Sequence, residues 1–229
     1  MKTLLVLLIL LLGLGVVLDR VAVNVADGKV ATQLQQKGDL KGPPSVDITG
    51  FPFLTQAVAG RYDAVRIGLT AADLGQPAGT RADVVLHGVR VPLSSVISGS
   101  VSTVPVDRID GTVAVPYALL SSKIGSDTRV TREGNGLRIT KTVDILGQRL
   151  PLTAVGQVTL DGSDLVVHVR EATGVGVDVP SWLLRRGAQL LDLRYAVPKL
   201  PFGLKLTSVT PSATGVNAGI AAKNVVLGG

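Results

Sequence analysis

The chain contains no cysteine and few aromatic residues. The absence of cysteine among 229 residues excludes a disulfide framework, a zinc–thiolate site, an iron–sulfur cluster and a cysteine nucleophile. Aromatic residues make up 3% of the chain and hydrophobic residues 46%, so a core must be built from Val, Leu, Ile and Ala. The shortage of rings also argues against base stacking on single-stranded nucleic acid.

The common catalytic motifs are also missing. The two histidines, His87 and His168, lie in separate strand-like segments and not in a metal-binding spacing. There is no G-x-S-x-G elbow for a serine nucleophile and no glycine motif for a nucleotide phosphate. The sequence therefore predicts no catalytic residue, no metal and no cofactor. A hydrolase stays as a third hypothesis, which requires titratable groups that converge in a cleft.

The charge balance is basic, with 23 Lys and Arg against 17 Asp and Glu and a formal net charge of +6. A nucleic-acid-binding protein usually concentrates such an excess in one run or on one helix. Here the basic residues are spread, and the one adjacent pair is Arg185-Arg186. We therefore predict no nucleic-acid partner, whereas an anionic membrane surface or lipid headgroup is compatible with the charge.

The N-terminus carries a long apolar run. Residues Thr3 to Leu18 form 16 uncharged positions between Lys2 and Asp19-Arg20, about 24 Å as a helix against ~30 Å of bilayer hydrocarbon. This is typical of an export signal, either a cleaved signal peptide or an uncleaved membrane anchor. No A-x-A pattern follows the run, which favours an anchor with Lys2 on the cytoplasmic side. We expect residues 1–18 to be this segment and residues 19–229 to form a single exported domain on the periplasmic side.

The exported part begins with helical periodicity and continues mostly as strands. Apolar residues recur every three or four positions from Asp19 to Gln36, which predicts a helix that continues the apolar run until Gly38. A polar, proline-containing connector follows from Lys37 to Ser45. The β-branched segments bounded by Gly, Asp, Asn and Pro predict strands at 46–48, 64–69, 84–91, 104–115, 129–145, 152–160 and 165–169.

Two turn signals and three proline junctions organise these strands. Asn135-Gly136 and Asp161-Gly162 predict hairpins within an antiparallel meander over 129–170, because both residue types tolerate the positive φ of tight turns. Val-Pro ends a strand-like segment in three places, at 88–96, 111–120 and 174–184. Proline blocks further sheet pairing and suits the first turn of a helix, so each copy predicts a strand-to-helix junction. The last junction opens an amphipathic helix over 181–192.

These elements predict an α+β fold in which a long, curved, mostly antiparallel sheet wraps amphipathic helices. Without large rings to fill it, the concave face is able to form a cavity for acyl chains. A solid core is the alternative that composition leaves open. Trp182 is likewise either a core residue or a membrane-interface anchor.

Three ordered motifs carry a family resemblance: GFPFLTQ at 50–56 followed by Gly60-Arg61-Tyr62, LHGVRVPL at 86–93, and LPFGLKL at 200–206. In these motifs the chain resembles an actinobacterial envelope family, domain of unknown function 2993, whose named member is the mycobacterial lipomannan elongation factor. The resemblance implies a fold similar to the tubular lipid-binding superfamily. It also implies binding of a phosphatidylinositol-type phospholipid or lipoglycan precursor, and support of mannan elongation or maintenance in the cell envelope.

The motif residues supply candidate lipid contacts. An extended chain at Pro52 would place the rings of Phe51 and Phe53 on the same side of one strand. The candidates for the acyl part are Phe51, Phe53, Leu54, Trp182 and Phe202. Guanidinium groups grip phosphate with two hydrogen bonds, and the candidates for the headgroup are Arg61, Arg90, Arg185 and Arg186.

The leading functional hypothesis is a non-enzymatic phospholipid-binding module at the outer face of the cytoplasmic membrane, with envelope glycosyltransferases as candidate protein partners. The alternative is an envelope scaffold with a solid core that acts through protein contacts. An elongated apolar cavity would distinguish the first from the second.

Overall fold

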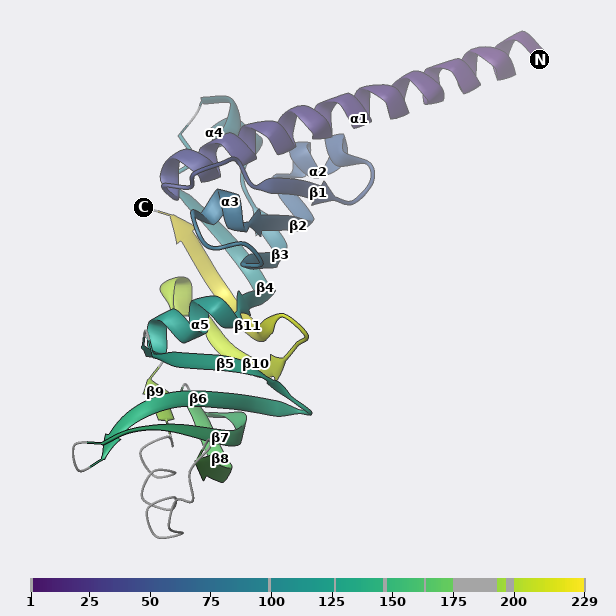
Figure 1. Ribbon diagram of the computed structural model, residues 1–229. Helices are drawn as coiled ribbons and strands as arrows, with labels where there is room; N and C mark the ends of the chain where they lie inside the picture. The colour runs from purple at the N-terminus through teal and green to yellow at the C-terminus, as the bar shows by residue number, and fades with distance from the viewer. Residues whose placement is uncertain are drawn as a thin grey trace. The chain divides into compact units, whose positions relative to one another are not determined.

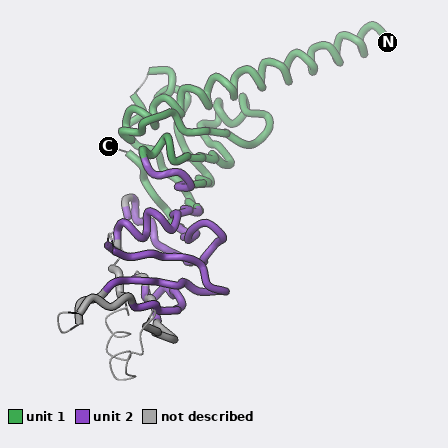
Figure 2. The backbone as a smooth tube through the Cα atoms, viewed as in Figure 1, with its two compact units in different colours: residues 1–75, 82–111, 222–229 green, residues 76–81, 112–221 purple. Residues whose placement is uncertain are grey.

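The computed structural model describes residues 2–98, 100–125, 127–145, 148–162, 164–174, 193–196 and 200–228. It is an α+β protein with two antiparallel sheets and a long N-terminal helix (Figure 1), which confirms the predicted fold class. The chain forms two compact units (Figure 2). Unit 1 comprises residues 1–75, 82–111 and 222–229, and unit 2 comprises 76–81 and 112–221.

Helix α1 (Lys2–Lys37) runs without interruption from the apolar segment into unit 1. Its apolar first half is exposed along its whole length, and it is the one described helix long and apolar enough to cross a membrane. The second half packs against β1 (Ser45–Thr49) and α2 (Phe53–Ala59) and buries Asp19 and Val23. The helix ends where the amide of Gly38 donates to the carbonyl of Leu34 at 2.9 Å, so the predicted helix is confirmed.

A six-stranded sheet has the order β1-β2-β3-β4-β11-β10. Its further strands are β2 (Arg61–Thr70), β3 (Arg81–Arg90), β4 (Thr103–Pro116), β10 (Lys205–Pro211) and β11 (Gly215–Gly228). β1 pairs with β2, and β10 with β11, in antiparallel register. The last two strands were not predicted, because Ser, Gly, Ala and Asn occupy many of their positions and weaken the alternating pattern.

The second sheet lies in unit 2 and has the order β5-β6-β7-β8-β9, with every pair antiparallel. Its strands are β5 (Thr128–Glu133), β6 (Gly136–Ile145), β7 (Gln148–Asp161), β8 (Asp164–Gly174) and β9 (Leu193–Ala196). Leu137 and Ile139 of β6 are 4% and 2% exposed, whereas Arg138 between them is exposed and pairs with Glu133. The predicted meander and its apolar face are confirmed here.

Unit 2 has an aliphatic core. Helix α5 (Tyr117–Ile124) packs against β5, and β10 contacts β7. The buried cluster joins strands from both ends of the unit through Val130, Leu137, Ile139 and Val216. Leu152 of β7 is fully buried. The core is built almost without rings, as the composition required.

The hairpin turns follow the prediction with one correction. Asp161 pairs with Asp164 across Gly162, whose φ is 63°. In the other hairpin Glu133 pairs with Gly136, so the turn is Gly134-Asn135, and Gly134 takes the positive φ of 55°. The predicted turn was therefore displaced by one residue, because glycine adopts this conformation at lower cost than asparagine.

Pro92 and Pro116 precede α4 (Leu93–Ser98) and α5, which confirms two predicted junctions. The third lies outside the described residues, as does the predicted helix over 181–192. Pro52 acts in the same way and precedes α2. The expected extended strand through Phe51 and Phe53 was therefore wrong. Two shorter helical turns, α3 (Ala71–Leu74) and the 3-10 turn Pro201–Gly203, complete the elements.

Candidate functional site

The first residue after the apolar run caps a second helix. The amide of Leu54, in the first turn of α2, donates to Oδ1 of Asp19 at 2.8 Å, and Nη2 of Arg20 donates to Oδ2 at 2.7 Å. Pro52 at the N-cap position offers no side-chain acceptor, so Asp19 supplies the missing cap from α1. Burial alone would raise the pKa of the Asp19 carboxyl, but hydrogen bonds from Leu54, Arg20 and Phe53 outweigh it and lower this pKa.

A second carboxylate ties α1 to the sheet. The amide of Ile48 in β1 donates to Oδ1 of Asp27 at 2.9 Å. Desolvation raises the pKa of Asp27 and exceeds the opposing effect of this hydrogen bond. Asp19, Val23 and Asp27 recur every four positions, so one face of α1 holds the unit at three successive turns.

Helix α2 has an apolar inner face and an apolar outer face. Phe53 and Ala57 are 6% and 7% exposed, and the ring of Phe53 lies 6.1 Å from that of Tyr62. Leu54 and Val58, also four positions apart, are 42% and 77% exposed. Such an outer face normally carries polar residues, so α2 presents apolar surface to its surroundings.

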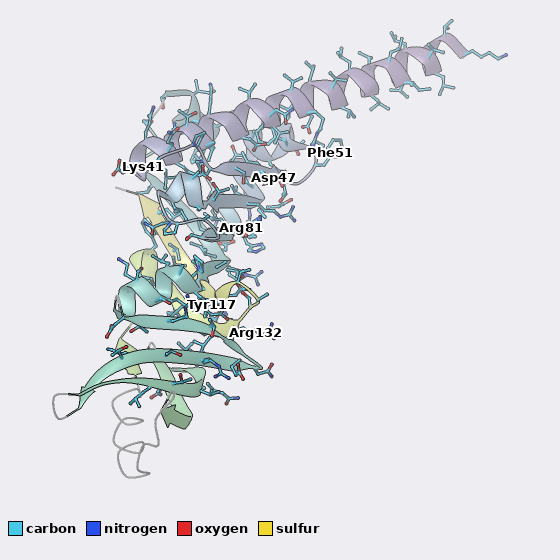
Figure 3. The ribbon with its side chains drawn as sticks, in the orientation of Figure 1. Lys41, Asp47, Phe51, Arg81, Tyr117 and Arg132 are labelled. Atoms are coloured by element: carbon cyan, nitrogen blue, oxygen red, sulfur yellow. The ribbon has the colours of Figure 1, made fainter. Side chains whose placement is uncertain are left out.

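The loop before α2 adds an exposed ring to this surface. Phe51 (Figure 3) is 64% exposed, and the guanidinium of Arg20 lies 5.3 Å from its ring centroid. The cation–π contact joins α1, two residues past the apolar run, to the loop. Both the ring and the guanidinium group stay exposed at the surface of unit 1.

Two of the predicted headgroup arginines meet on one carboxylate. Arg61 begins β2, immediately after α2, and Arg90 ends β3; both form ion pairs with Asp107 of β4, Nη2 of Arg61 at 3.6 Å. Gly88 makes room for Asp107, since a Cβ at this position (φ 62°) would overlap Oδ2 of Asp107. The two guanidinium groups stay largely solvent-accessible. They are therefore available to a phosphate as well as to Asp107.

A neighbouring ion group involves the first histidine. Nε2 of His87 lies 3.3 Å from Oδ2 of Asp110, and Nε of Arg108 lies 2.7 Å from the same oxygen. All three side chains are at least one-third exposed. Within the described part of the chain, no three His, Cys, Asp or Glu residues form a group able to hold a metal ion. This arrangement is a surface cluster in which His87 and Arg108 contact the same carboxylate.

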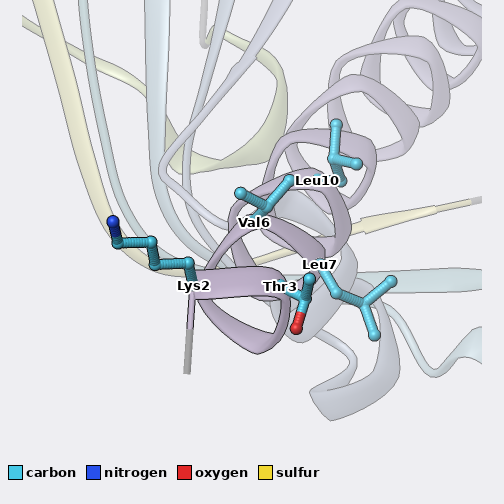
Figure 4. Close-up of a pocket in the computed structure, with 5 residues that line it drawn as sticks. All are labelled: Lys2, Thr3, Val6, Leu7 and Leu10. Atoms are coloured by element: carbon cyan, nitrogen blue, oxygen red, sulfur yellow. The ribbon is translucent and has the colours of Figure 1, made fainter.

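Two hollows among the described residues lie along α1. One is an apolar groove on the first turns of the helix, lined by Lys2, Thr3, Val6, Leu7 and Leu10 (Figure 4). The other is a shallow groove farther along, between Asn24 and Gln33. Both are open depressions between the side chains of one helix.

The predicted site residues have different surroundings. Four of them are exposed in unit 1: Phe51, Leu54, Arg61 and Arg90. Phe51 and Leu54 lie at the start of the seven-residue helix α2, which is about 10 Å long. The two arginines lie past its other end. Phe53 is a core residue. Phe202 lies in unit 2, is 51% exposed and has a φ of 58°. Outside the described residues lie Trp182, Arg185 and Arg186.

Sequence reasoning missed four members of the site: Asp19, Arg20, Val58 and Asp107. Asp19 and Arg20 mark the end of the apolar run in the sequence, and this conceals the capping role of Asp19, although carboxylates are preferred helix caps. The spacing of Val58 from Leu54 would have indicated a helical face had the strand at 51–53 not been assumed. No sequence signal pairs Asp107 with arginines 46 and 17 positions earlier, because only the sheet register brings them together.

The structure therefore joins a long apolar helix to a sheet domain, with exposed apolar and arginine side chains at the end where the helix packs on the domain. The family model described as LmeA-like phospholipid-binding matches residues 17–219, and the chain belongs to this family. The family is one of lipid-binding proteins, so phospholipid is the class of ligand. No curated protein and no solved structure gives a significant match.

Proposed function

We propose that the protein is a non-enzymatic, extracytoplasmic phospholipid-binding protein, held at the outer face of the cytoplasmic membrane by α1 and selective for a phosphatidylinositol-type headgroup. The observation that carries the headgroup assignment is the pair of exposed guanidinium groups, Arg61 and Arg90, gathered at Asp107. The family match supports phospholipid as the ligand. Lys2 before the apolar run supports an orientation with the sheets outside the cytoplasm.

Binding in this proposal is a partition and not a reaction. The Asp107 carboxylate balances one of the two arginine charges, so a phosphate diester finds one uncompensated positive charge and two planar sets of N–H donors. Burial of acyl chain contributes about 0.8 kcal/mol for each CH₂ group. The headgroup contacts then select among lipids, while the acyl contacts supply most of the affinity.

The family resemblance of the sequence motifs extends this proposal to a biological role. A protein that holds phosphatidylinositol-anchored glycan precursors at the outer leaflet would present them to envelope glycosyltransferases and so support mannan elongation or maintenance. Such a role requires lipid exchange with the membrane, because a permanently bound precursor would block further elongation.

The test is lipid retention by the full chain. The protein, extracted from membranes in detergent, is mixed with equal amounts of phosphatidylinositol and phosphatidylcholine and examined by native mass spectrometry. We expect phosphatidylinositol to predominate in the bound fraction. Arg61→Ala combined with Arg90→Ala should reduce this preference about tenfold, which corresponds to ~1.4 kcal/mol.

The matched control is Arg66→Ala, an equally exposed arginine of β2 that pairs with Asp47 at 3.5 Å. This variant should keep the preference of the native chain. If the native chain, the double arginine variant and Arg66→Ala all prefer phosphatidylinositol over phosphatidylcholine to the same degree, the headgroup assignment is contradicted. A native chain that retains neither lipid would contradict lipid binding itself and favour the scaffold alternative.

A further inference from the structure

The apolar outer face of α2 and the loop before it form one exposed surface, which we call the α2 shoulder and define as Phe51, Leu54 and Val58. These side chains are 64%, 42% and 77% exposed. Single exposed apolar residues are ordinary, but a contiguous group of large ones marks a contact surface. The shoulder belongs to unit 1, and α1 contacts α2 directly.

The shoulder is fixed at the end of the apolar run. Asp19, the first residue after that run, accepts the hydrogen bond of Leu54, and Arg20 lies over the ring of Phe51. The loop that carries Phe51 extends beside α1 toward its N-terminal half (Figures 1 and 3). A bilayer crossed by residues 3–18 would therefore have its outer boundary at the level of the shoulder.

The length of the apolar run leaves a gap that the shoulder is placed to fill. Its 16 residues span about 24 Å, roughly 6 Å less than the hydrocarbon core. Such a deficit is met by thinning of the bilayer or by flanking side chains that reach into it. On α1 itself, Val21 and Val25 are 55% and 54% exposed, so apolar surface continues beyond Asp19 on the helix face turned away from the unit.

Charge at the shoulder also matches a lipid surface. Arg20 is half-exposed beside Phe51, and Arg61 and Arg90 lie past the other end of α2. Cationic side chains at the two ends of an apolar contact favour an anionic leaflet, and one positive charge remains after Asp19 and Asp107 balance two of the three arginines. A protein partner would also cover apolar surface, but neither the position beside the apolar run nor the length deficit would call for one.

We propose that the α2 shoulder is a second membrane contact, in which Phe51, Leu54 and Val58 insert into the outer leaflet of the anionic phospholipid bilayer that α1 crosses. The unit thus stands on the membrane at two adjoining points, the helix and the shoulder. The contact is with the bilayer surface and does not depend on which headgroup the arginines select.

The absence of cysteine makes the test direct. Single cysteines replace Phe51 or Val58 in the full chain, are labelled with the environment-sensitive fluorophore NBD, and are reconstituted into vesicles of phosphatidylcholine with one-third phosphatidylinositol. We expect blue-shifted emission at both positions. Quenching by lipids with nitroxide groups on their acyl chains should be several-fold stronger there than at Val226→Cys, a residue of β11 with 59% exposure.

Leu10→Cys, inside the apolar run, reports that the helix is inserted. If position 10 is quenched while positions 51 and 58 are quenched no more than position 226, the shoulder does not touch the bilayer and the proposal fails. The same measurement in pure phosphatidylcholine separates this contact from headgroup binding. The shoulder should still be quenched there, even if the arginine pair proves to have no preference for phosphatidylinositol.

Discussion

Asp19 shows how one buried carboxylate organises the end of unit 1 that adjoins the apolar run. It is 2% exposed, and its two oxygens accept from the backbone of α2 and from Arg20. A buried charge is tolerated only when its hydrogen bonds replace those of water. The same residue ends the apolar run and caps the neighbouring helix, so a change at this position affects both.

We predict that Asp19→Asn lowers the stability of the full chain at neutral pH and removes part of its acid sensitivity. The pKa of Asp19 in the folded chain lies below its ordinary value of 3.8. Its contribution is therefore complete above pH 3.8 and is lost as the pH falls through the folded-state pKa. Thermal unfolding of the detergent-solubilised chain between pH 7 and pH 2 measures both effects.

Asp39→Asn is the control, because this side chain is 98% exposed and pairs only with Lys41 at 3.8 Å among the described contacts. It should unfold like the native chain over the whole range. An Asp19→Asn chain with the native pH profile would show that the cap contributes no charge-dependent stability.

At the scale of elements, α2 depends on glycine at its end. Gly60 is the C-cap residue, with a φ of 64°, and its amide donates to the carbonyl of Ala57. Its own carbonyl accepts from Val91 at 2.9 Å, which joins the end of α2 to the end of β3. The left-handed conformation turns the chain directly into Arg61, so the cap also positions the arginine pair.

We predict opposite effects for two glycine-to-alanine changes. Gly60→Ala should lower the free energy of unfolding by about 1–2 kcal/mol, since alanine is strained at positive φ and its Cβ would lie 3.1 Å from Pro92. Gly28→Ala lies inside α1 with open space around the added methyl group. This change should raise the free energy of unfolding by about 0.5–1 kcal/mol. Chemical denaturation of both full chains measures the difference. Equal effects would mean that the backbone conformation at Gly60 is not the one described.

At the scale of the whole molecule, the two sheets and the two compact units bury mainly aliphatic side chains. In unit 2 the buried face of the five-stranded sheet is formed by Leu137, Ile139, Leu152 and Ala154, all at most 4% exposed. Side chains of this kind stabilise mainly by leaving water and by close packing. With so few rings available, each large aliphatic residue carries a large share of that contribution.

We therefore predict that Leu152→Ala lowers the free energy of unfolding by about 2–5 kcal/mol, the range for a buried leucine whose cavity cannot collapse completely. Hydrogen exchange of the amides in β6 and β7 should accelerate correspondingly. Val226→Ala, at an exposed position, should change stability by less than about 0.5 kcal/mol. Unchanged exchange in the Leu152→Ala chain would mean that this strand is not part of the core.

Local patterns were sufficient for much of the fold. The helix of residues 2–37, the meander from β5 to β8 and two of the proline junctions depend on short-range periodicity and turn chemistry, which are visible in sequence. The strand expected through Phe51 and Phe53 failed because Pro52 satisfies two local rules equally: it holds a chain extended and it starts a helix. In the folded chain Phe53 begins helix α2, and Asp19 of α1 caps that helix by accepting the hydrogen bond of the Leu54 amide.

The sequence by itself determined the chemistry that is possible: an aliphatic core, no thiol chemistry, an apolar N-terminal helix and a phospholipid-binding family motif. Only the tertiary structure decided which residues share a site, because Asp19 and Leu54, or Arg61, Arg90 and Asp107, are far apart along the chain and meet through helix packing and strand register. It also decided which phenylalanine is core and which is surface. Burial depends on the whole packed unit and not on the residues beside each ring.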